Sequence, residues 1–117
     1  MDIPTVKITG QLLKSDNSVL ANANIYIKLM IPEGYNYLIC ESTPSYLIGT
    51  ENILAITDEE GNIKNSDGND LELIPNSILN PVNSYYLICI MDGDYIFAIT
   101  RWKLENQDCD VGEIPYS

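Results

Sequence analysis

Few side chains in this chain of 117 residues are suited to catalysis or metal binding, and most of those are carboxylates. The chain has no histidine, which removes the commonest general base and the commonest metal ligand. Residues 58–70 are rich in the oxygen ligands that calcium prefers, but neither register puts a glycine and a closing glutamate where an EF-hand loop requires them. We expect instead two polar turns joined by Ile63 and Lys64, with Gly61 and Gly68 at positive φ, and no metal site.

The other side chains of chemical interest are isolated from one another. Asp92 and Asp94 flank the glycine of a turn, where carboxylates favour solubility and turn formation over catalysis. Trp102 lies between two basic residues, and in a chain with only six of them we interpret it as a core or sheet-edge residue, not a ring-stacking site. No nucleophile elbow, phosphate loop or paired-carboxylate motif occurs. The sequence therefore predicts a protein that is not an enzyme and that takes no cofactor.

The three cysteines have wide spacings that match neither a zinc site nor a disulfide framework. Cys40 and Cys89 lie in apolar runs, so we expect them to be buried, reduced and unreactive. Cys109 lies between two aspartates, and we expect it to be the most accessible of the three. Neighbouring carboxylates disfavour the thiolate, so it too should react slowly.

The overall composition is that of one acidic globular domain. Hydrophobic residues make up 45% of the chain, and 17 acidic residues against 6 basic ones give a net charge of -11. Such a surface repels phosphate backbones and anionic lipid headgroups, so we expect no nucleic-acid partner and no membrane insertion. The chain begins without a secretory signal pattern, and no apolar run approaches the roughly 18 to 20 residues that span a bilayer. Synthesis in a cytosol is the resulting expectation.

The elements that must hold these residues are β-strands, because apolar and polar residues alternate with period two along most of the chain. Short strands separated by polar turns predict an all-β fold, a two-layer antiparallel β-sandwich of seven to eight strands, immunoglobulin-like or prealbumin-like. Residues 1–117 are expected to form a single domain, with 105–117 as an acidic C-terminal tail. The expected strands are residues 6–12, 24–29, 35–40, 46–48, 52–57, 71–74, 84–91 and 95–104.

The two strands within residues 84–104 are apolar on both faces. With Asp92 and Gly93 as a two-residue loop, Ile90 is expected to face Tyr95. In a lone two-layer sandwich one face of this hairpin should be polar, so something must cover the second face. The cover is either residues 31–50 of the same chain or another protein chain. The predicted interface residues, expected on one side of the hairpin, are Tyr86, Ile88, Ile90, Tyr95, Phe97 and Ile99.

Several short motifs resemble a known family of small β-sandwich modules. Residues 6–12 (Val-Lys-Ile-Thr-Gly-Gln-Leu), the turn at 16–17 and the run 20–27 resemble the opening of carboxypeptidase-regulatory-like, or prealbumin-like, modules. Residues 57–62 (Thr-Asp-Glu-Glu-Gly-Asn) are similar to their Thr-Asp-x-x-Gly turn. The chain departs from the pattern at Ser18-Val19, where a glycine-proline pair is usual, and at 65–70, which looks like an inserted second turn. The segments that resemble a variant in bacteriophage virion proteins are 71–76, 79–81, 84–86 and 114–115.

This resemblance implies a building block that attaches, decorates or presents, without catalytic residues. The expected function is that of a structural module in a phage-like particle, in the tail, tail fibre or head decoration, acting in assembly or host-surface attachment. Its expected partners are proteins, either further copies of the chain or other virion proteins, and its expected location is the virion. The alternative is a prealbumin-like accessory or adhesion module that binds a protein or glycan on a cell surface.

Overall fold

The computed structural model of this protein describes residues 3–40 and 46–114, and within them the chain is all-β. These residues form eleven strands and two single turns of 3-10 helix, η1 (Asn76–Ile78) and η2 (Val111–Glu113). Among the described residues, no helix is long and apolar enough to cross a bilayer. The strands are β1 (Val6–Thr9), β2 (Asn24–Met30), β3 (Leu38–Cys40), β4 (Tyr46–Ile48), β5 (Ile53–Thr57), β6 (Ile63–Asn65), β7 (Leu71–Leu73), β8 (Leu79–Asn80), β9 (Tyr85–Asp92), β10 (Tyr95–Trp102) and β11 (Cys109–Asp110).

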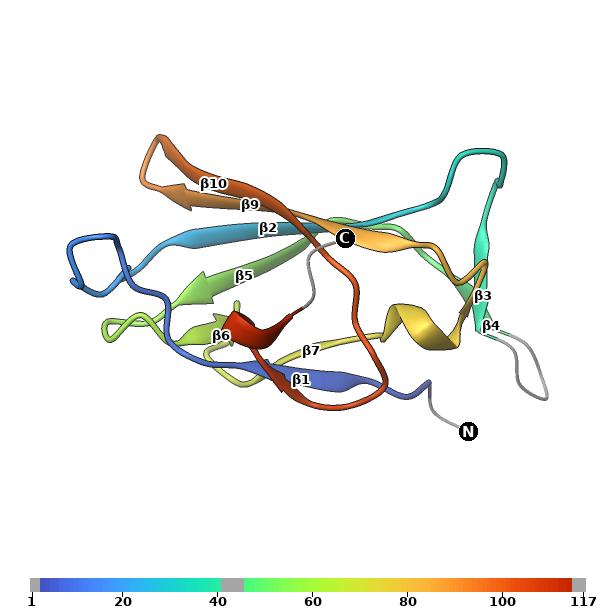
Figure 1. Cartoon of the computed structure of the whole chain (residues 1–117), viewed down its shortest axis with the longest axis horizontal. Helices are drawn as coiled ribbons and strands as arrows, with labels where there is room; N and C mark the ends of the chain where they lie inside the picture. Colours follow the sequence, from blue (N-terminus) through green and yellow to red (C-terminus); the bar gives the residue numbers. More distant parts are fainter. Residues whose placement is uncertain (1–2, 41–45, 115–117) are drawn as a thin grey trace.

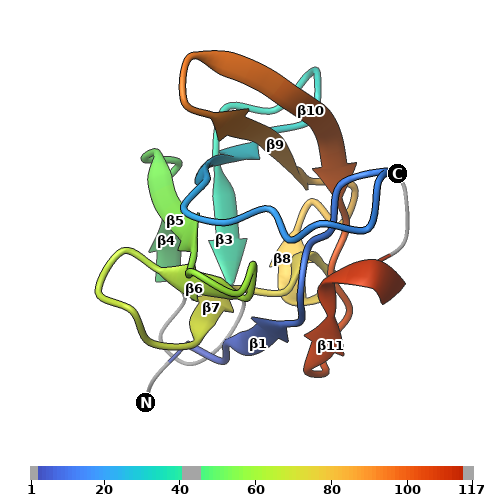
Figure 2. The same cartoon turned by 90° about the vertical axis from the view of Figure 1, so that its left-hand side faces the viewer.

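The strands form three sheets around one hydrophobic core (Figure 1). The largest sheet has five antiparallel strands in the order β10-β9-β2-β5-β6. The sheet β11-β1-β7 lies on the other side of the core, and β4-β3-β8 stands at one end of the molecule (Figures 1 and 2). The predicted all-β class is confirmed, and two sheets facing each other across a core agree with a β-sandwich.

The number of strands exceeds the seven or eight predicted. The sequence missed β6, β8 and β11, which are only two or three residues long. Each of these three strands contains a single apolar residue, so it shows no alternation of apolar and polar residues that could reveal it. Such strands form because neighbouring backbones supply hydrogen-bond partners, which is a property of the folded chain.

Part of the segment predicted to be a tail belongs to a sheet. β11 pairs in parallel with β1, with Ile8 opposite Cys109, and the Asp108 side chain accepts a hydrogen bond from the Lys7 backbone N–H at 2.8 Å. Leu104, where the chain leaves β10, is 2% exposed. The described residues of 105–114 are thus attached to the domain by backbone pairing, and residues 115–117 lie outside the described part.

One buried asparagine holds both ends of the β9–β10 hairpin. Asn76, which is fully buried, donates from Nδ2 to the Ser84 hydroxyl at 3.1 Å, just before β9 begins. Its Oδ1 accepts from the Leu104 backbone N–H at 2.9 Å, just after β10 ends. The hairpin therefore leaves and returns to the core at fixed points, and only its register decides which side chains face outward.

The polar stretch 58–70 forms two turns of the same design, as the sequence predicts. In the first, Asp58 Oδ1 accepts from the backbone N–H groups of Glu60 and Asn62. In the second, Asn65 Oδ1 accepts from the backbone N–H groups two and four residues later. Gly61 and Gly68 occupy the matching fourth positions with φ of 82° and 85°, where a side chain would be strained.

Thr57, which opens the first turn, ties it to the loop before β2. The side chain is 1% exposed; its hydroxyl donates to the Leu20 carbonyl at 2.6 Å and accepts from the Ala23 backbone N–H at 2.8 Å. The Thr57 N–H also donates to the Ala23 carbonyl at 3.0 Å. Thr57 is therefore part of the framework that connects β2 to β5.

Replacing Thr57 with valine keeps the shape of the side chain but leaves a buried N–H and a buried carbonyl without the hydroxyl. We expect Thr57→Val to lower the free energy of unfolding by about 2 kcal/mol in urea denaturation. Thr57→Ser is the matched control, because it keeps both hydrogen bonds and loses only one methyl, at about 1 kcal/mol. Equal losses in the two variants would show that the hydroxyl contributes nothing.

Candidate interaction surface

The register of the β9–β10 hairpin differs from the predicted one. Asp92 pairs with Tyr95, so the two-residue loop is Gly93 and Asp94, one position later than predicted. Gly93 has a φ of 63°, whereas Asp92 does not have a positive φ. A glycine at the first central position agrees with a type II′ turn, while the predicted loop is of type I′ and needs a positive φ at Asp92 as well.

A β-bulge in β10 then shifts the pairing a second time. Ile96 lies opposite Met91, but Ala98, not Phe97, lies opposite the next residue of β9, Ile90. Phe97 is the extra residue of β10. Because side chains alternate between the two faces, inserting one residue reverses the face of every residue that follows.

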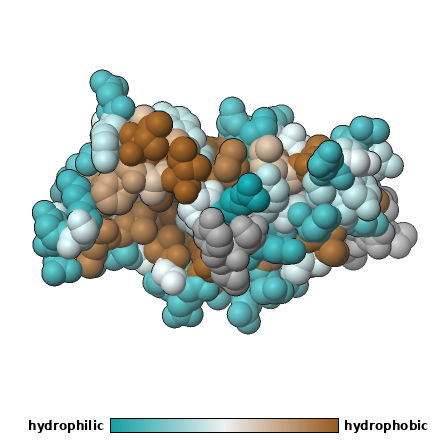
Figure 3. All heavy atoms as spheres, turned by 45° about the horizontal axis from the view of Figure 1, so that its top comes forward, coloured by the Kyte–Doolittle hydropathy of each residue, from teal (hydrophilic) through white to brown (hydrophobic). Residues whose placement is uncertain are grey.

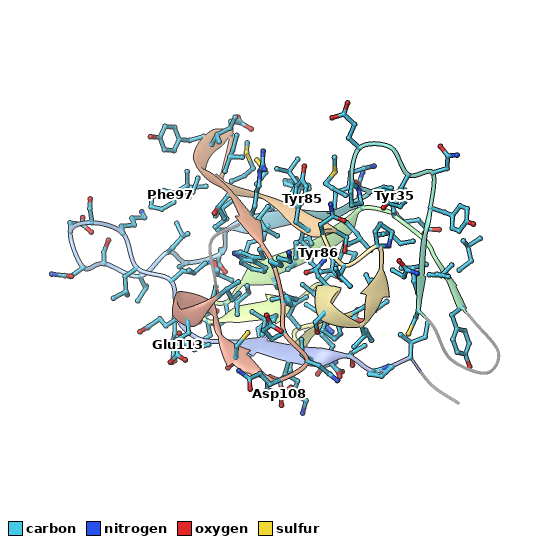
Figure 4. All side chains as sticks on the ribbon, turned by 45° about the vertical axis from the view of Figure 1, so that its right-hand side comes forward. Tyr35, Tyr85, Tyr86, Phe97, Asp108 and Glu113 are labelled. Atoms are coloured by element: carbon cyan, nitrogen blue, oxygen red, sulfur yellow. The ribbon has the colours of Figure 1, made fainter. Side chains whose placement is uncertain are left out.

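The six predicted interface residues therefore do not share one surface, and the prediction that they do is wrong. Tyr86, Ile88 and Ile90 belong to the buried core, with exposed fractions of 2%, 0% and 7%. Tyr95, Phe97 and Ile99 are exposed. Figure 4 shows the division within β9 itself, since Tyr86 points between the sheets and its neighbour Tyr85 points away from them.

A different set of residues forms an apolar outer face on the five-stranded sheet. Ile99 pairs with Cys89, Cys89 with Tyr26 and Tyr26 with Leu54, so one row of side chains crosses four strands on the side away from the core. Figure 3 shows apolar side chains gathered on the half of the molecule that carries the hairpin. The exposed apolar residues of this outer face are Tyr26, Leu54, Leu87, Ile96 and Ile99, and its half-buried residues include Ile56, Cys89 and Met91.

The charge of the outer face is opposite to that of the whole chain. None of its described strand residues is a carboxylate, although the chain has 17 acidic residues. Three of the six basic residues lie on it: Lys28 beside Leu87, Lys64 beside Ile56, and Arg101, whose guanidinium carbon lies 4.8 Å from the centre of the Tyr85 ring. Lys64 is paired with Asp70, with 3.6 Å between the Lys64 Nζ and an Asp70 carboxylate oxygen. The outer face thus combines an apolar centre with a basic rim at Lys28 and Arg101, on a protein of net charge -11.

The segment 31–50, one of the two predicted covers for this face, does not lie over it in the described part. Leu38, Cys40 and Ile48 of this segment are buried in the core at the end of the molecule. Residues 41–45 fall outside the described residues. Ile99 and Ile96 remain 64% and 52% exposed. The apolar second face that the sequence predicts is therefore open among the residues that the structure describes.

The other side chains that the sequence analysis considered for catalysis or metal binding have structural roles. Asp58 and Asp16 use their carboxylates to accept hydrogen bonds within turns, and the pKa of each is lowered, chiefly by the bonds from Asn62 and Ser18 respectively. Asp92 lies 3.5 Å from the Lys14 ammonium. Trp102 is 5% exposed and belongs to the core, as predicted. Within residues 3–40 and 46–114, no three side chains of the metal-binding kinds cluster together.

The chain has no match among protein-family models, curated proteins or solved structures.

Serine substitutions at two isoleucines test the register of the hairpin. Ile88 is fully buried, so Ile88→Ser is expected to lower the free energy of unfolding by about 3 kcal/mol or more, through the lost apolar contacts and a buried hydroxyl. Ile99→Ser makes the same change on the outer face and, at concentrations low enough for the chain to be monomeric, should alter stability by less than about 0.5 kcal/mol. Chemical denaturation of the two variants measures both values. Similar losses would contradict the separation of these residues onto opposite faces.

Thiol labelling tests the environment of the cysteines. Cys40 is buried, but Cys89 is half-buried on the outer face and not fully buried as predicted, while Cys109 is half-buried. Figure 4 labels Asp108 and Glu113, two of the acidic residues whose charges act on Cys109. Burial, followed by the charges of Asp108, Asp110 and Glu113, raises the pKa of Cys109. A raised pKa means less thiolate at a given pH, so the labelling rate of Cys109 should reach its plateau at a higher pH than that of an ordinary thiol.

The Asp108→Asn variant is the control for the charge effect on Cys109, because the amide oxygen can still accept the Lys7 N–H. This variant should label faster at pH 8 in a Cys89→Ala background. A rate unchanged by the substitution would contradict the electrostatic part of the explanation.

Proposed function

We propose that this protein is a non-enzymatic structural module of a phage-like particle, in the tail, tail fibre or head decoration, where it acts in assembly or host-surface attachment. The observation that carries the proposal is the apolar outer face of the five-stranded sheet. A contiguous apolar face on a protein of net charge -11 marks a contact with another macromolecule.

The resemblance to virion modules supports this role and agrees with the positions of its motifs. The opening motif spans β1 and the turn that follows it, and the Thr-Asp-x-x-Gly motif forms the hydrogen-bonded turn after Thr57. The Pro75-Asn76 pair of the phage-like segment supplies the buried asparagine that anchors the hairpin. The motifs thus occupy structural positions, which suits a module whose surface, not an active site, carries its function.

The chemistry of the outer face defines the partner. Its centre takes apolar side chains, and its rim places Lys28 and Arg101 where they meet carboxylates. Another acidic protein surface with exposed apolar residues, such as a neighbouring component of the particle, provides both. A nucleic acid is a poor partner, because the outer face has only three cations and the net charge of -11 on the chain repels phosphate groups.

Incorporation into particles tests the proposal. Particles purified by density gradient should contain the wild-type chain, detected by mass spectrometry, and should lose it when Leu87 and Ile96 are both changed to lysine. Leu47→Lys is the control, because Leu47 is 74% exposed on β4, away from the outer face, and this variant should be incorporated normally. Absence of the wild-type chain from particles would refute the proposal. Equal incorporation of all variants would show that the outer face is not the surface that attaches the chain to the particle.

One observation favours the alternative, an adhesion module that binds a glycan. Tyr35 and Tyr37 are 55% and 58% exposed and line an open groove of about 320 Å³ with Asn36, Asn80 and Pro81. Exposed aromatic rings beside amide groups suit the apolar and polar faces of a sugar. Retention of the wild-type chain on a glycan array, lost in Tyr35→Ala, would favour this function over the particle module.

A further inference from the structure

β10 is the long open edge among the described strands. The other edge strands, β4, β6, β7, β8 and β11, have two or three residues each, whereas β10 has eight and spans about 24 Å. Proteins guard long edges with charges, prolines or irregularities. From Tyr95 to Thr100, β10 has no charged residue, proline or glycine. Of the features that hinder pairing with another strand, the described part of β10 has the bulge at Phe97.

The backbone groups on the open side of β10 have no partner in the described part of the chain. One side of β10 pairs with β9 from Tyr95 to Trp102. Among the described residues, no backbone or side-chain hydrogen bond reaches the backbone of 95–101 from any other segment. An edge of this kind offers a ready row of donors and acceptors to another strand.

The charges at the two ends of β10 select the orientation of such a strand. Asp94 lies in the turn at its start, and Arg101 and Lys103 lie at its end. A second copy of β10 running antiparallel brings Asp94 of each copy next to the basic end of the other. A parallel copy would place like charges side by side, which is unfavourable. The strand is therefore complementary to itself in one orientation.

We infer that β10 pairs with β10 of a second copy, antiparallel about a two-fold axis at Ile99, so that two five-stranded sheets join into one of ten strands. In this register Ile99 faces Ile99 and Phe97 faces Arg101, which sets an aromatic ring beside a cation. The axis is perpendicular to the sheet, so both outer faces lie on the same side. The inference builds on the proposed function, because the joined outer faces form one larger surface for the next component of a particle.

A charge swap at the symmetry axis tests this pairing. Ile99→Lys and Ile99→Asp each place like charges opposite each other, so each variant alone should be monomeric at concentrations where the wild type is a dimer. An equimolar mixture should restore a dimer, seen as a heterodimer by native mass spectrometry and light scattering, with at least tenfold tighter association than either variant alone. Ile99 is 64% exposed, so thermal melts should confirm that both variants fold.

Leu54 provides the matched control. It lies on the same outer face in the same row, three strands from β10, and is 42% exposed. Leu54→Lys and Leu54→Asp should leave the dimer intact, alone or mixed. A wild type that stays monomeric overturns the edge pairing. The proposed function is tested separately, by the incorporation of the chain into particles. Dissociation by the Leu54 variants, without rescue in the Ile99 mixture, also overturns the edge pairing and assigns self-association to the outer face.

Discussion

The structure depends on one constraint: side chains of a strand alternate between two faces, and β9 is apolar on both of them. A chain of 117 residues supplies one core, and the inner faces of β2 and β9 fill it with Ile25, Ile27 and Ile88. The sheet β11-β1-β7 and the end sheet β4-β3-β8 pack against that inner side. No second layer remains among the described residues for the other side, so the apolar outer face follows directly from how little chain there is to cover it.

A single extra residue decides which hairpin side chains make up that face. Without the bulge at Phe97, Ile99 would follow the face of Tyr86 into the core, and with it Ile99 stands outside while Ala98 and Trp102 turn inward. Trp102 then packs beside Tyr86, whose hydroxyl donates to the Ile74 carbonyl at 2.7 Å. The bulge thus places Ala98 and Trp102 on the core side of β10 and Ile99 on its outer side.

The acidic residues are distributed in a way that leaves the outer face basic. Carboxylates concentrate in turns, in loops and at strand ends, where Asp16, Asp58 and Asp110 accept hydrogen bonds from backbone N–H groups and so stabilise the local backbone. The strands of the five-stranded sheet carry cations on their outward positions instead. A protein with a strongly negative net charge therefore presents one surface suited to apolar and acidic partners, and this contrast underlies the structural role we propose.

The sequence alone determined the all-β class, the two polar turns of 58–70, the burial of Trp102 and the presence of apolar residues on both sides of the hairpin, because these follow from local spacing and residue type. Only the tertiary structure decided which residues form the surface. The turn at Gly93-Asp94 and the bulge at Phe97 are backbone choices among close alternatives in the same apolar sequence. The short strands β8 and β11 are likewise set by distant partners, since backbone hydrogen bonds with other segments, not their own side chains, hold them in place.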